Sequence, residues 1–183
     1  TVSSPVVASL DVNDGKGERE VTFIGSSDGV LRAIGTSSGL SGIHSPDLVW
    51  ESVDLGGGRV IKTLLSGDGS VYIVHNEGMA RVNMTGHVVS TLAMSGMSGS
   101  PILTEEGALI FTAPSSGGAS GYSVFRTTSD LDTLWECQLE SDVNDVSPAL
   151  TEGGIMIIGT DDGDLVGIQT YDISSSAAEA RQG

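Results

Sequence analysis

Short apolar runs separated by glycine-containing turns recur along the whole chain. In the second repeat the runs cover residues 60–65, 71–75, 79–83 and 87–92. The turns between them contain Asp68-Gly69, Glu77-Gly78 and Thr85-Gly86. Glycine supplies the positive φ that tight hairpin turns need, so Asp-Gly or Glu-Gly between apolar runs predicts a hairpin. The pattern therefore predicts four short antiparallel strands in each repeat.

The second run of each repeat is almost entirely apolar. These runs are Val21–Ile24, Val71–Val74, Leu109–Phe111 and Ile155–Ile158. Strict alternation would leave one face of a strand in water, whereas a continuous apolar run predicts a strand that is covered on both faces. Parallel α/β sheets also contain such strands, but the sequence shows no crossover helices. We therefore expect antiparallel sheets that pack face to face.

A recurring sequence motif gives the length of one repeat. Ser-Pro followed by two apolar residues occurs at Pro5, Pro101 and Pro148, with separations of 96 and 47 residues. A period of about 47 residues with four short strands per unit is typical of β-propeller blades. The predicted fold is all-β, with about four blades (three complete, plus three strands of a fourth) that form part of a larger ring. We place the blades at residues 3–55, 59–95, 99–141 and 146–173, and a tail at 174–183.

Composition and charge narrow the range of functions. The chain has 183 residues, with 8 Lys+Arg against 24 Asp+Glu and a formal charge of −16. Such a field repels nucleic acid and anionic membranes, so neither is expected as a partner. No apolar run approaches the length of a membrane helix. The sequence begins at Thr1, which indicates a processed mature protein or a segment of a longer chain.

The sequence resembles one family of propeller repeats. The opening Ser4-Pro5-Val6-Val7, the hairpin at residues 24–34 and the late Trp50 and Trp135 are similar to quinoprotein-type repeats. Such repeats form pyrroloquinoline-quinone dehydrogenases and non-enzymatic relatives, including outer-membrane assembly lipoproteins. The resemblance spans residues 3 to about 170 and implies blade architecture rather than an activity, because the fold hosts many functions. Relatives close rings of about six to eight blades. We therefore expect half a ring, whose two open blade faces are covered by the rest of a longer chain, a second copy or another subunit.

An acidic segment near the N-terminus has a second resemblance. Residues 11–18 are similar to the calcium loop of integrin-type FG-GAP repeats, which implies Asp11, Asn13, Asp14 and Glu18 as candidate calcium ligands. Asp11 and Asn13 match the alternate acids of that loop. Gly15 occupies the next alternate position, however, and Asp14 is out of phase. The alternative interpretation is a solvated acidic hairpin loop.

Other motifs have simple structural interpretations. Asn83-Met84-Thr85 is a glycosylation sequon in a predicted turn. Residues 161–164 place three carboxylates in another turn, as a weak cation site or a solvated charge cluster. The nucleophile-elbow pattern occurs at residues 25–29 and 35–39, but that chemistry needs a strand followed by a helix, whereas both copies lie in predicted hairpins. We therefore assign no catalytic residue.

The single cysteine and the histidines add no site. Cys137 is interpreted as a small buried hydrophobic residue, and one cysteine cannot form an internal disulfide. His75 ends a predicted strand and His87 begins another at the opposite end of the sheet, so they cannot share a metal ion. His44 lies in the long loop at residues 40–47, which together with residues 115–121 is a candidate binding loop.

These observations favour a non-enzymatic propeller segment that serves as a structural or protein-interaction module, without a cofactor. One alternative is a fragment of a quinone-dependent dehydrogenase, for which the family resemblance implies a quinone cradle, a calcium ion, a carboxylate base and often adjacent cysteines. Another is a calcium-dependent adhesion module. Expected partners are other proteins, the missing part of the same chain or a second copy. The sequon and the resemblance favour an extracytoplasmic location, and adaptation to high salt is the other explanation of the acidity.

Overall fold

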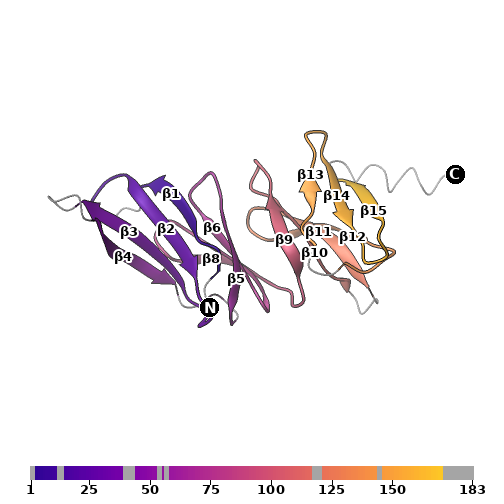
Figure 1. The fold of residues 1–183 in the computed structure, drawn as a ribbon, viewed down its shortest axis with the longest axis horizontal. Helices are drawn as coiled ribbons and strands as arrows, with labels where there is room; N and C mark the ends of the chain where they lie inside the picture. Colours follow the sequence, from indigo (N-terminus) through magenta and orange to yellow (C-terminus); the bar gives the residue numbers. More distant parts are fainter. Residues whose placement is uncertain are drawn as a thin grey trace. The chain divides into compact units, whose positions relative to one another are not determined.

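The fold consists almost entirely of antiparallel β-sheets (Figure 1). The computed structural model describes residues 3–11, 15–38, 44–52, 55, 58–116, 121–143 and 146–170, with the backbone alone at 36–38, 44–45 and 98. In the described part of the chain, fifteen strands form three four-stranded sheets and one three-stranded sheet, each with neighbouring strands in chain order. The predicted all-β blade architecture is confirmed.

Each sheet is named here as a blade. Blade 1 contains β1 (Val6–Leu10), β2 (Arg19–Gly25), β3 (Leu31–Ser38) and β4 (His44–Ser52). Blade 2 contains β5 (Val60–Leu65), β6 (Val71–His75), β7 (Gly78–Val82) and β8 (Val88–Ala93). Blade 3 contains β9 (Ser98–Leu103), β10 (Leu109–Pro114), β11 (Tyr122–Thr127) and β12 (Thr133–Gln138). Blade 4 contains β13 (Ala149–Leu150), β14 (Ile155–Gly159) and β15 (Leu165–Gln169).

The chain divides into two compact units, Thr1–Gly96 with blades 1 and 2, and Met97–Gly183 with blades 3 and 4. The predicted tail at 174–183 lies outside the described residues.

One turn geometry is repeated in seven hairpins. In each, the first turn residue donates its N–H to the carbonyl of the fifth, and the fourth donates to the carbonyl of the first. The turns occupy residues 26–30, 66–70, 83–87, 104–108, 128–132, 151–155 and 160–164. The fourth position has positive φ in every copy, and it is glycine in all of them except Leu131, with φ 69°. This geometry explains the glycine spacing of the sequence.

The first unit has its core between blades 1 and 2. Phe23 and Leu31 of blade 1 are buried against a cluster that includes Val60 and Ile73 of blade 2. A Cβ atom added at Gly25 would lie 2.3 Å from Val60 Cγ1, so only glycine permits this approach. The apolar residues of the first two repeats therefore form one core, in which the sheet of blade 1 packs face to face on the sheet of blade 2.

Polar contacts join the same two blades. Ser3, which is buried, donates its N–H to the Gly25 carbonyl at 2.7 Å and accepts the Gly25 N–H on its Oγ at 3.0 Å. The same Oγ lies 2.9 Å from the hydroxyl of Thr63 on β5. Ser3 therefore links the end of β2 to the first strand of blade 2.

The second unit repeats this arrangement between blades 3 and 4. Ile110 and Val124 of blade 3 are buried in one cluster with Met156 and Ile158 of blade 4. Arg126 on β11 donates from Nη1 to the Thr170 carbonyl at 2.8 Å and thereby fixes the chain just after β15. Each unit is thus a pair of stacked sheets with an aliphatic core.

Burial of the second strand differs from blade to blade. All residues of β6 are buried, as are residues 109–113 of β10, which agrees with coverage of both faces. In β2, Thr22 and Ile24 are only half-buried. In β14, which belongs to the last described blade, Ile155 and Ile157 are 41% and 40% exposed, which is the kind of open apolar face that a partial ring is expected to have. One face of β14 packs on blade 3, and no described residue covers the other.

Candidate functional site

Blade 4 has an exposed, largely apolar face. By the strand register it is formed by Ala149, Ile155, Ile157, Gly159, Leu165, Gly167 and Gln169. Leu165 is 79% exposed. Strands β13, β14 and β15 contain no ionisable residue, so no charge must be desolvated when a partner covers this face.

Blade 1 also has an exposed face, on the side away from blade 2. One row of residues crosses the sheet by its register, from Val7 to Thr22, Ile34 and Leu48. Val7 and Leu48 are 58% and 55% exposed. Ile24 lies on the same side of β2 as Thr22. This row is therefore apolar apart from Thr22, and the exposed Glu20 lies on the same side of β2.

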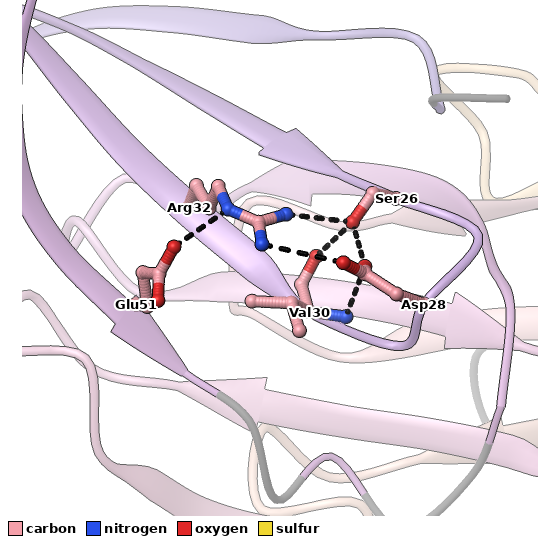
Figure 2. Close-up of polar contacts among 5 residues, drawn as sticks. All are labelled: Ser26, Asp28, Val30, Arg32 and Glu51. Atoms are coloured by element: carbon pink, nitrogen blue, oxygen red, sulfur yellow. Dashed lines mark hydrogen bonds and ion pairs between the residues drawn. The ribbon is translucent and has the colours of Figure 1, made fainter.

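A polar network lies at one end of that blade (Figure 2). Arg32 donates from Nε to Glu51 Oε1 at 2.7 Å and from Nη1 to Ser26 Oγ at 2.9 Å. Its Nη2 lies 3.3 Å from Asp28 Oδ2, and Asp28 also accepts bonds from the Ser26 hydroxyl and the Val30 N–H. The hydrogen bond from Ser26, followed by that from Arg32, lowers the pKa of Asp28. The network pairs Arg32 with carboxylates and ties the β2–β3 turn to β4.

An acidic cleft lies at one end of the second unit. Its volume is about 750 Å³, and it is lined by Gly121, residues 138–142 and Asp161 with Asp162. The Asp161 N–H donates to the Asp142 carbonyl at 2.9 Å, which brings together two segments that are about 20 residues apart in the sequence. Glu140 and Asp142 therefore join the predicted carboxylate turn. Among the described residues, no group of three or more His, Cys, Asp or Glu side chains is arranged to hold a metal ion.

The candidate calcium loop is only partly described. Asn13 and Asp14 lie outside the described residues, whereas Asp11 and Glu18 lie inside them. Glu18 accepts a hydrogen bond from Ser9 Oγ at 3.1 Å. Lys16, within the loop, pairs with Asp47, and this contact is the main cause that lowers the pKa of that carboxyl group. A cationic side chain in the loop is unfavourable for a dication, and the calcium site stays a prediction.

The predicted glycosylation residue lies in a tight turn. Asn83 Oδ1 accepts hydrogen bonds from the Thr85 N–H at 3.0 Å, the Thr85 hydroxyl at 2.8 Å and the His87 N–H at 3.0 Å. Asn83 thus stabilises the β7–β8 turn through its side-chain oxygen. Glycan attachment, which uses the amide nitrogen, stays a prediction.

The remaining motifs have structural roles. Residues 25–29 form a strand–turn–strand hairpin between β2 and β3, not the strand–turn–helix of a nucleophile elbow, and the second copy ends at Gly39, outside the described residues. His75 pairs with Gly78 at one end of the sheet and His87 lies at the other, as predicted. The side chain of His44 is not described.

The interpretation of Cys137 as buried is wrong. Its thiol is partly exposed, because β12 is the edge strand of blade 3 and no described strand covers it.

No helix in the described part of the chain has the length and hydrophobicity that a membrane crossing requires.

Solved structures with a similar fold exist for this chain, although its sequence matches no family model. No protein-family model matches the chain, and no curated protein is significantly similar to it. Among solved structures, BamB from Moraxella catarrhalis matches with a TM-score of 0.60 and 16% identity, over 82% of this chain and 46% of BamB. The computationally designed protein Ika4 matches with a TM-score of 0.59 and 13% identity, over 91% of both chains. A protein from Bacteroides uniformis, provisionally named a 6-phosphogluconolactonase, matches with a TM-score of 0.51 and 14% identity, over 91% of this chain and 55% of that one.

This chain therefore spans less than half the length of BamB. Identities this low bear on fold alone. Together with the four antiparallel sheets in chain order, the structural matches show that the chain has a β-propeller blade fold similar to that of BamB.

Proposed function

We propose that the protein is a non-enzymatic propeller module that binds another polypeptide through the exposed face of blade 4. One observation carries the proposal: Ile155, Ile157 and Leu165 form an uncharged, exposed sheet face whose opposite side is packed on blade 3. A contiguous apolar surface of this kind is typical of an interaction site. The backbone of this sheet is already held by its packing on blade 3, so a partner need not order it on binding.

The hairpin context of the elbow motif supports the non-enzymatic interpretation. Residues 25–29 close a turn in which Ser26 and Asp28 are bonded to Arg32, and this geometry serves to hold the turn. The lining of the acidic cleft consists of four acidic residues together with Gly121, Gln138, Leu139 and Ser141, and it contains no histidine, lysine or cysteine. We further propose an extracytoplasmic location, which the sequon at Asn83 and the acidic surface support.

The proposal is tested by native mass spectrometry of the protein isolated from its own cells without denaturant. We expect a mass that exceeds 18.7 kDa by that of a bound polypeptide. Leu165→Glu, at a position that is 79% exposed, should abolish this complex without unfolding the chain. Val89→Glu, at a 50% exposed position on β8, is the matched control and should retain it. A protein that is isolated only as free monomer would contradict the proposal.

A further inference from the structure

The exposed face of blade 4 corresponds, position by position, to a face of blade 1 that is buried. Gly25 pairs with Leu31 in blade 1, and Gly159 pairs with Leu165 in blade 4, with the same turn between them. By the same register, Phe23 corresponds to Ile157, Val21 to Ile155 and Ala33 to Gly167. In blade 1 these positions are 0% exposed, because blade 2 covers them. The exposed face of blade 4 therefore has the pattern of a face that receives a following blade.

The exposed face of blade 1 corresponds to the other side of a blade. In both units, one face of a sheet packs on the following sheet, and the following sheet uses its other face for this contact. In blade 1 the face toward the following blade is occupied, so the open face with Val7 and Leu48 is the one that meets a preceding blade. One chain thus presents both halves of a blade–blade contact, each without its partner among the described residues.

The charges of the two faces permit their contact. The protein carries a net charge of −16, and two copies repel each other at long range. The exposed face of blade 4 has no charged residue, and on blade 1 the Arg32 guanidinium is already bonded to Glu51 and Asp28 (Figure 2). A contact between these faces therefore buries no unpaired cation. The exposed Glu20 lies on the same side of β2 as Thr22, but the strands of blade 4 bring no second carboxylate against it.

We propose that the occupant of the exposed face of blade 4 is a second copy of this chain, bound through the exposed face of its blade 1. This inference rests on the proposed function and names the partner. The contact is head-to-tail, so it either closes a ring or extends an array, and the mass of the assembly distinguishes these. The chain spans 46% of BamB, so two copies would supply a similar length of propeller.

The test uses the purified full chain and its variants in light scattering coupled to size exclusion, over a range of micromolar concentrations. We expect a mass above 18.7 kDa, which is a fixed multiple for a closed ring and grows with concentration for an array. Leu165→Glu and Val7→Glu should each raise the dissociation constant by roughly 10- to 100-fold, since each places a carboxylate in an apolar contact. Val89→Glu, at a position that is 50% exposed and on neither face, should leave the mass unchanged. Circular dichroism and thermal melting check that each variant is folded.

Mixing provides the decisive measurement. A Leu165→Glu copy retains a normal blade 1, and a Val7→Glu copy retains a normal blade 4, so an equimolar mixture should form a two-copy complex that neither variant forms alone. A monomeric wild-type protein, an oligomer that is insensitive to both substitutions, or a mixture that remains monomeric overturns the inference. If the chain is a monomer when pure but isolated in complex with a different polypeptide through Leu165, the proposed function stands and only the identity of the partner is wrong.

Discussion

The turn at residues 83–87 offers a sharp test of how the hairpins support the core. Gly86 has φ +83°, and a Cβ atom added there would lie 2.8, 2.9 and 3.0 Å from Cδ2, Cε3 and Cγ of Trp50. Trp50 packs on Phe23 with 5.7 Å between ring centroids, and its Nε1–H donates to the Met84 carbonyl at 2.9 Å. Gly86→Ala therefore strains the backbone and also displaces a ring that joins blade 1 to blade 2.

The two contributions have different magnitudes. A non-glycine residue in the left-handed region costs about 1–2 kcal/mol. Forcing a methyl group into a packed site costs about 1–3 kcal/mol more, which includes disturbance of the indole hydrogen bond. Gly86→Ala should therefore lower the free energy of unfolding by about 2–5 kcal/mol. Gly17, in the same unit, has φ +74° and nothing within 4 Å of an added Cβ, so Gly17→Ala should cost about 1–2 kcal/mol at most.

The assay is urea unfolding followed by tryptophan fluorescence. The chain has two tryptophans, so the substitution Trp135→Phe leaves Trp50 as the only reporter, and it belongs to the first unit. The quantity compared is the difference in unfolding free energy between the Gly86 and Gly17 variants. If Gly86→Ala is no more destabilising than Gly17→Ala, Trp50 does not pack against this turn as described, and the reasoning is refuted.

Three further predictions concern stability. Ser3→Ala should lower the free energy of unfolding of the first unit by about 1–3 kcal/mol, since the Gly25 N–H and the Thr63 hydroxyl lose a buried partner; Ser9→Ala, on the exposed side of β1, is the control in urea unfolding. Burial lowers the pKa of His75 below the ordinary 6.5. The carboxylate of Glu77 and the Leu55 carbonyl act in the other direction, but the effect of burial is larger. The folded state therefore binds that proton less readily than the unfolded state, and stability is full above pH 6.5 and falls as the pH drops below it. Urea midpoints between pH 7.5 and 5.5 should fall less for His75→Gln than for the wild type, and an identical pH dependence would contradict this. Arg126→Met should lower the melting temperature of the second unit, as the Thr170 carbonyl loses its donor, whereas Glu106→Gln, at the exposed end of the ion pair with Arg126, should have a smaller effect in calorimetry.

Sequence periodicity predicted the strands better than their surroundings. Glycine spacing and apolar runs predicted four strands at residues 60–65, 71–75, 79–83 and 87–92, and the structure has them at Val60–Leu65, Val71–His75, Gly78–Val82 and Val88–Ala93. The positions of these strands are determined by the local geometry of the turns between them, so they can be predicted from the residues of the turns. The turn at 128–132 could not be recognised from glycine spacing, because its fourth position is Leu131. This residue adopts the positive φ, and its side chain is buried.

The candidate surfaces depend on register and on neighbours, which local patterns do not encode. Ile155 and Met156 are adjacent and equally apolar, yet one is exposed and the other buried. The Arg32–Glu51 pair follows from the β3–β4 register with its irregularity between Ala33 and Ile34. The acidic cleft combines Glu140 and Asp142 with Asp161 through a backbone hydrogen bond between distant segments. Each requires knowledge of which residues lie opposite one another.

The repeated turn also determines where the negative charge lies, and this has a measurable consequence. An acid occupies the third turn position at Asp28, Asp68, Glu106, Asp130 and Asp162, so carboxylates gather at the ends of the blades. The exposed face of blade 4 remains uncharged. Repulsion between copies then acts at long range, while the proposed contact itself is apolar. Raising the ionic strength from about 0.02 to 0.5 M shortens the screening length several-fold and should strengthen copy–copy association, as measured by the dissociation constant. Association that weakens with salt would mean that ion pairs hold the copies together, and the apolar faces would not be the contact.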